Sequence, residues 1–110
     1  MSLQERQDPI FEFERLVKAG SYFEAHEAME DIWIEHGRRF GDVWQGLTQL
    51  AVSLTHASRG NHRGAARVNQ KAMAKLNDAG REEEAIRAAV DLAQAIYEDL
   101  MAGEARRNSD

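Results

Sequence analysis

No Asp, Glu, Lys or Arg occurs between Val43 and Ser58, although these four residue types make up 30% of the 110 residues in the chain. A helix of this length on a protein surface carries charged residues along its solvated side. The uncharged stretch therefore predicts a helix at the centre of the fold, with neighbouring helices covering more than one of its faces. On a helical wheel, one of these faces is apolar and the opposite one carries neutral polar residues.

Capping signals divide the rest of the chain into helices. Residue types that favour helix N-termini recur before each segment with helical periodicity, and the glycines fall mostly between these segments. We expect five helices, over about residues 9–19, 22–36, 43–58, 62–78 and 82–101. The signals are Asp8 before Pro9, Ser21 with Glu24, Asp42 with Gln45, and Asn61.

The predicted fold is all-α, a single-domain antiparallel helical bundle of about five helices over residues 1–110. Short connections between the helices favour antiparallel neighbours, and no segment has the alternating pattern of a strand. The ordered core should cover about residues 8–101, and the tail over 103–110 should be frayed.

Composition narrows the classes of function. Cysteine is absent, which excludes disulfides and a cysteine nucleophile and leaves only nitrogen and oxygen ligands for a metal. No apolar run reaches the roughly 18 residues of a membrane span and no signal peptide is recognisable, so we expect a cytoplasmic protein without membrane contact. The net charge of −5 argues against nucleic acid as a partner. The expected partner is an unknown small molecule or another protein.

Two polar residues fall within the apolar stripe of the second predicted helix. That stripe consists of Tyr22, Phe23, Met29, Trp33 and Ile34. His26 and Glu30 lie in its middle, one turn apart, so their side chains can touch. A carboxylate that points into a core needs a hydrogen bond, an ion pair or a metal ion. Glu30 is therefore expected to have a partner.

That partner is expected from the central helix. Its second face should be buried against the second helix and carries Gln45, Gln49, Val52 and His56. This contact would bring His26, Glu30 and His56 together. Two imidazoles and a carboxylate can bind Zn²⁺, Mn²⁺, Fe²⁺ or Ni²⁺ and leave a position for a nucleophilic water. We therefore predict a divalent-metal site at these three residues, with Gln49 in support, in a hydrolase for an unknown small substrate.

Glu27 is the candidate general base of such a site if its side chain turns inward. The string from His26 to Glu30 also echoes the H-E-x-x-H zinc helix, with glutamate at the position of the second histidine. That difference removes a defining ligand of the motif. The hydrolase hypothesis therefore depends on the predicted contact between the two helices.

Two non-enzymatic interpretations stay open. The His/Glu cluster can be a hydrogen-bonded network that only fixes helix packing. Alternatively, the chain is a helical interaction module of the tetratricopeptide kind, because the segments around Gly20 and Gly60 are faintly alike, although their separation does not match that repeat. An uncovered apolar flank would also allow a homo-oligomer. An acidic partner could bind a basic ridge formed by Arg59, Arg63, Arg67, Lys71 and Lys75.

An ordered series of short motifs resembles one known family. The motifs are Tyr22 to Glu27, Glu30 with Trp33, Gly46 to Ala51, His56, Gly60 with Asn61, and Gly64 with Ala65. They are similar to the domain of unknown function 309 family, small helical proteins described as predicted metal-dependent hydrolases. The resemblance covers about residues 10–77, with Thr48 and Thr55 where more apolar residues are expected. It implies an all-α bundle with signature positions at His26, Glu27, Glu30, Trp33, Gln49 and His56.

Overall fold

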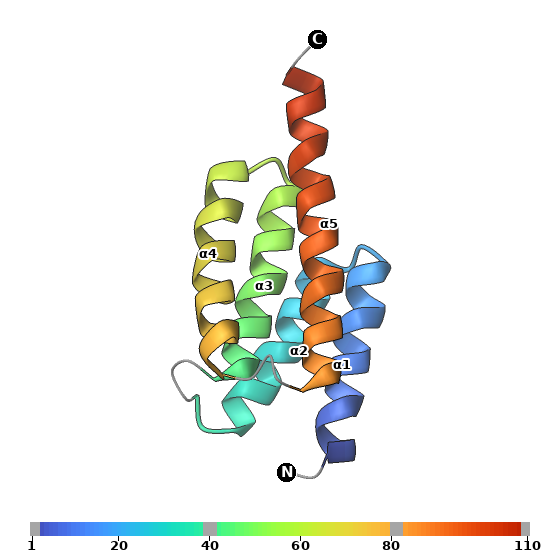
Figure 1. Ribbon diagram of the computed structural model, residues 1–110, viewed down its shortest axis with the longest axis vertical. Coiled ribbons are helices and arrows are strands. Elements are labelled where there is room, and N and C mark those ends of the chain that lie inside the picture. Colours follow the sequence, from blue (N-terminus) through green and yellow to red (C-terminus); the bar gives the residue numbers. More distant parts are fainter. Residues whose placement is uncertain (1–2, 39–41, 80–82, 109–110) are drawn as a thin grey trace.

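The three middle helices begin and end close to where the sequence predicts. The computed structural model describes residues 3–38, 42–79 and 83–108, and all regular structure in these ranges is helical. No helix within them is long and apolar enough to cross a membrane. The predicted all-α bundle is confirmed, and its helices (Figure 1) are α1 (Leu3–Lys18), α2 (Tyr22–Glu35), α3 (Val43–Ser58), α4 (His62–Ala79) and α5 (Glu84–Asn108).

Side-chain caps account for two of the helix starts. The Asp42 carboxylate accepts the backbone N–H of Trp44 at 2.7 Å, and the Asn61 amide oxygen accepts that of Gly64 at 3.0 Å. Each satisfies a donor that the first turn of a helix leaves without an internal partner. Ser21 stands at the N-cap of α2, but its side chain makes no capping hydrogen bond, so the capping box predicted there is wrong.

Both terminal helices are longer than predicted. α1 begins at Leu3, which places Pro9 inside the helix rather than in its first turn. The residue types at positions 4–7 form helices readily, and a proline removes only one backbone hydrogen bond there. α5 continues to Asn108, although fraying is predicted from residue 103. This last stretch contains alanine, glutamate and arginine, residue types that favour a helix.

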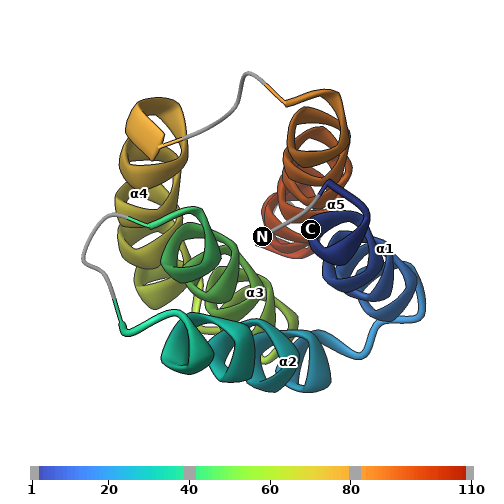
Figure 2. The same cartoon turned by 90° about the horizontal axis from the view of Figure 1, so that it is seen from below.

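α3 lies at the centre of the bundle, as its lack of charge predicts. It packs against α2, α4 and α5, while α1 packs against α2 and α5. Seen from one end, α4, α3, α2, α1 and α5 follow one another in an arc (Figure 2). α2 and α3 run antiparallel, and α5 projects beyond the other helices, which gives the molecule a long axis of 50 Å (Figure 1).

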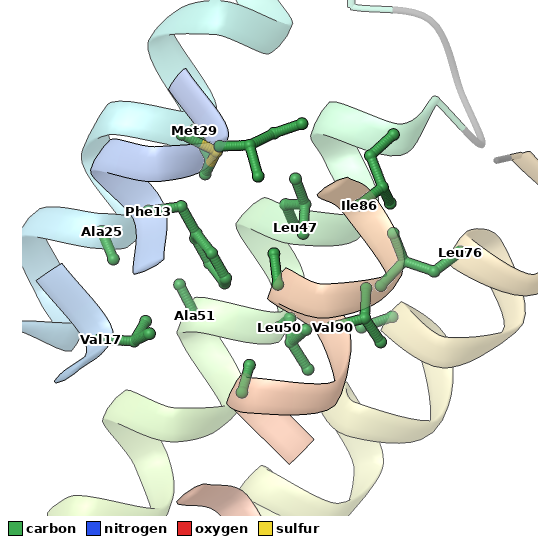
Figure 3. Close-up of a cluster of buried hydrophobic side chains, with 14 of the residues drawn as sticks. Phe13, Val17, Ala25, Met29, Leu47, Leu50, Ala51, Leu76, Ile86 and Val90 are labelled. Atoms are coloured by element: carbon green, nitrogen blue, oxygen red, sulfur yellow. The ribbon is translucent and has the colours of Figure 1, made fainter. Parts of the chain in front are cut away.

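The apolar core fills the space between α3 and the other four helices. Leu47 and Leu50 of α3 have no exposed surface, and side chains from all the other helices surround them (Figure 3). α3 and α4 approach so closely that a Cβ added at Gly46 would lie 2.7 Å from the Cγ of Leu76. The labelled neighbours in this cluster are Phe13, Val17, Ala25, Met29, Ala51, Leu76, Ile86 and Val90.

Candidate functional site

α2 is rotated relative to the sequence prediction, and this moves the candidate residues to the edge of the helix contact. The buried residues of α2 are Ala25 and Met29, whereas Phe23 is 47% exposed and Ile34 is 40% exposed. The prediction that Phe23 and Ile34 are buried is therefore wrong. The small side chain of Ala25 explains the rotation, because it lets α2 approach its neighbours closely on that side.

His26 and Glu30 touch, as their spacing predicts. The Nε2 of His26 lies 3.1 Å from the Oε2 of Glu30, and the two side chains are 23% and 45% exposed. The expectation of a Glu30 buried in the core is wrong, because nearly half of this side chain is in contact with solvent. The His26 ring also packs at a tilt against the ring of Phe23, with centroids 5.5 Å apart. These two contacts hold the imidazole at the edge of the α2–α3 interface.

A pocket of about 260 Å³ opens between α2 and α3 beside this pair. His26 and His56 line it from opposite helices, so the predicted pairing of α2 with the second face of α3 brings two imidazoles into one pocket. Glu30 and Gln49 lie outside the lining, one turn farther along their helices. The lining comes from α2, α3 and the residue after α3, and consists of Phe23, His26, Val52, Thr55, His56 and Arg59.

Hydrogen bonds around Asn61 determine which nitrogen of His56 carries a proton. The Asn61 amide oxygen accepts the Gly64 N–H, so its Nδ2, a donor, faces the Nδ1 of His56 at 3.1 Å. The Nδ1 must then accept, and a neutral His56 carries its proton on Nε2. Gly64 makes this possible, since a Cβ at that position would lie 2.6 Å from the Asn61 Nδ2.

Arg59 lies where the sequence prediction does not place it. The prediction that it belongs to the basic ridge of the fourth helix is wrong, because Arg59 lines the pocket and its guanidinium carbon lies 5.9 Å from the centroid of the Phe23 ring. That distance is within the range of a cation–π contact. Spacing was the signal that could have found it. Arg59 follows Thr55 by four residues and Val52 by seven, so it extends the same face of α3.

Gln49 contributes a buried polar atom to the α2–α3 contact. Its Oε1 is buried, and none of the described residues donates a hydrogen bond to it. Leaving a buried carbonyl oxygen without a donor costs free energy. This atom is therefore available to accept a hydrogen bond from water or from a ligand one turn below the pocket.

The two other predicted site residues lie on the sides of α2. Trp33 is partly buried and packs against the apolar core. Glu27 is exposed and does not line the pocket. Neither side chain reaches the pocket in the described arrangement, so a role for Glu27 as general base would require its side chain to move.

The contact between His26 Nε2 and Glu30 Oε2 has the length of a hydrogen bond, 3.1 Å. Two ligand atoms of one metal ion would have a similar separation, about 3.0–3.4 Å for bonds of about 2.1 Å at an angle of about 90–109°. Among the described residues, however, no group of three or more His, Cys, Asp or Glu side chains is placed to hold an ion. His56 shares the pocket, but its Nδ1 is engaged by Asn61. The site is thus a hydrogen-bonded histidine–glutamate pair with a second imidazole across the pocket.

Comparisons with known proteins identify the family. A family model described as "Domain of unknown function (DUF309)" matches residues 10–68, which include every residue that lines the pocket. The uncharacterized protein YpuF of Bacillus subtilis (strain 168) is 33% identical over 84 residues, 72% of this chain and 48% of YpuF. The chain thus spans about half the length of this relative. No solved structure matches the chain described by this sequence. The chain belongs to the DUF309 family, a family of unknown function.

Proposed function

We propose that this chain is a metal-dependent hydrolase whose reaction takes place in the pocket between α2 and α3. The observation that supports this most is the 3.1 Å contact between His26 Nε2 and Glu30 Oε2, beside a pocket that also contains the His56 imidazole. The resemblance to proteins described as predicted metal-dependent hydrolases points in the same direction.

His26 and Glu30 would hold the ion, for which Zn²⁺, Mn²⁺, Fe²⁺ and Ni²⁺ are the candidates that favour nitrogen and oxygen ligands. A bound ion of this kind lowers the pKa of a water molecule toward neutrality. The chain's own contribution is to fix both ligands. Phe23 supports one face of the His26 ring, and the helix holds Glu30 one turn away.

His56 has a different role in this proposal. With its Nδ1 accepting from Asn61, its Nε2–H can donate a hydrogen bond to a substrate oxygen. Acting as a third ligand would instead require Asn61 to release the Nδ1. The proposal also keeps Gln49 as an acceptor that orients water, and Glu27 as a general base whose exposed carboxylate swings toward the pocket.

Calorimetric titration of metal-stripped, tag-free protein with each of the four ions tests the proposal. We expect one ion per chain. His26→Gln and Glu30→Gln should each weaken metal binding by at least about tenfold, because even the loss of a residue that only supports a ligand lowers metal affinity by that factor. Glu35→Gln is the matched control, because Glu35 is an exposed carboxylate on the same helix. His56→Gln should leave the metal affinity unchanged if His56 is a hydrogen-bond donor to the substrate, and should lower the metal affinity if His56 is a ligand.

Hydrolysis of p-nitrophenyl phosphate and p-nitrophenyl acetate by the metal-loaded protein then tests the reaction. Turnover of either ester that is lost in His26→Gln and Glu30→Gln supports a hydrolase. The proposal fails if less than one ion binds per chain, or if both variants bind metal as the unmodified protein does. Stoichiometric binding without turnover of either ester would reduce the proposal to a metal site alone.

A further inference from the structure

We propose that the pocket between α2 and α3 selects a small organic anion, with its acid group, a phosphate or a carboxylate, on Arg59 and its apolar part against Phe23 and Val52. This inference rests on the proposed function, because it names the substrate class of the same pocket. The anion-binding step itself needs no metal, which makes the two separable by experiment.

Arg59 is a positive charge held at the pocket without a compensating carboxylate. None of the described acidic residues forms an ion pair with it, and its one described side-chain contact is the face of the Phe23 ring at 5.9 Å. The ring restrains the guanidinium through a cation–π contact but accepts none of its five N–H donors in a salt bridge. Those donors are therefore free to form a bidentate contact with an acid group.

The remaining lining fits the same kind of ligand. It includes no aspartate or glutamate, so no carboxylate of the lining itself repels an anion. His56 offers a second donor, because Asn61 keeps the proton of the neutral ring on Nε2. The Thr55 hydroxyl donates to the Ala51 carbonyl at 3.0 Å, so toward a ligand it can only accept. Arg59 thus supplies the charged donors of the pocket and His56 a neutral one.

Size and shape limit the ligand to a small molecule. A volume of about 260 Å³ is just below the roughly 300–1,000 Å³ typical of sites for drug-sized ligands. Phe23 and Val52 give the pocket an apolar wall, which an inorganic anion would leave uncovered. An acid with a compact apolar or aromatic body fills both parts of the pocket.

The helix that follows Arg59 in the chain, α4, carries a basic ridge. Arg63, Arg67 and Lys71 recur along it at steps of four residues, all are exposed, and no described residue forms an ion pair with them. The chain as a whole carries a net charge of −5. This ridge is therefore a local positive region on an acidic protein, and such a region raises the local concentration of anions.

Nuclear magnetic resonance titration of the full chain, without metal and with a chelator, tests the inference. The probes are two aromatic acids, phenyl phosphate and benzoate. Benzyl alcohol serves as the neutral probe with the same aromatic ring, and inorganic phosphate as the acid without a ring. We expect saturable shifts at the signals of Thr55, His56 and Arg59 with at least one of the two aromatic acids, and weaker binding of the other two probes. The tighter of the two acids identifies the acid group.

Arg59→Gln should weaken the binding of the preferred acid by about tenfold, the value of one hydrogen-bonded charge contact. Arg63→Gln is the matched control, since it removes an exposed arginine of the α4 ridge that does not line the pocket. The inference is overturned if Arg59→Gln binds the acid as the unmodified protein does, if Arg63→Gln loses as much, or if benzyl alcohol binds equally well.

The same variants separate this inference from the proposed function. Arg59→Gln should keep its affinity for the metal ion, and Glu30→Gln should keep its affinity for the aromatic acid. If the ion does not bind but Arg59 still selects the acid, the hydrolase proposal fails and the anion pocket stands. If the ion binds through His26 and Glu30 and Arg59→Gln changes nothing, the anion pocket fails and the metal site stands.

Discussion

The two long faces of α3 meet different surroundings. On one face, Leu47, Leu50 and Leu54 have no exposed surface and belong to the apolar core. Figure 3 shows Leu47 and Leu50 within it. On the other, Val52 and His56 are half-buried and border the pocket toward α2. Burial excludes charge from the first face, whereas the second is uncharged and still reached by solvent. A neutral polar face of this kind is where a small-molecule site can form without destabilising the core.

Truncation on the core face should have the largest effect on stability. Leu47→Ala removes a fully buried side chain and leaves a cavity among rigid neighbours, which should lower the free energy of unfolding by about 3 kcal/mol. Urea denaturation followed by circular dichroism measures this loss. Val52→Ala is the matched truncation on the pocket face and should cost less than about 1 kcal/mol, since Val52 is already partly in water. Equal losses would show that the two faces do not differ.

Gly46→Ala tests the close approach of α3 to α4. The new methyl group would lie 2.7 Å from the Cγ of Leu76, so this fully buried side chain would have to shift within the core. The overlap should outweigh the better helix propensity of alanine and cost about 1–2 kcal/mol. Gly103→Ala is the control, because a Cβ there meets nothing within 4 Å, and it should stabilise α5 by up to about 1 kcal/mol. If both variants gain stability, the contact between α3 and α4 is looser than described.

The fold could be predicted in detail where local chemistry decides it. The bounds of α3 follow from the Asp42 cap and from the uncharged run after it, and the structure has them at the same residues. The central place of α3 follows from the same run. The rotation of α2 could not be predicted. A helical wheel places the large apolar residues Phe23 and Ile34 on the buried side and does not show that the neighbouring helices pack against Ala25. The length of α5 depends on residue propensities, which an argument from apolar periodicity ignores.

The candidate site was predictable in part, for the same reason. The contact of His26 with Glu30 follows from their spacing on one helix, and the meeting of His26 with His56 follows from pairing α2 with the second face of α3. The exposure of Glu30 and the position of Arg59 over Phe23 depend on the rotation and register of two helices. Those are set by packing across the whole bundle, which the residues of one segment do not encode.

Gln49→Leu tests the unsatisfied polar atom on the pocket face of α3. It removes a buried Oε1 that no described residue satisfies and adds apolar surface, so it should raise the free energy of unfolding by about 1 kcal/mol. Gln45 is the matched control, since it lies one turn earlier on the same face and does have an interaction partner. Gln45→Leu should therefore destabilise the protein. A loss of stability in Gln49→Leu would mean that a water molecule satisfies its amide.

The smallest effect is expected for the pair that supports the functional proposal. His26 and Glu30 are partly exposed and one turn apart, and such pairs contribute about 0.3–0.5 kcal/mol to a helix. A double-mutant cycle with His26→Gln and Glu30→Gln, measured by urea denaturation in the presence of a chelator, should give a coupling energy of that size. A coupling above about 2 kcal/mol would assign the pair to the core and favour the purely structural network. A small coupling, together with the loss of metal binding in the same variants, would mean that these two residues contribute to ligand binding far more than to folding.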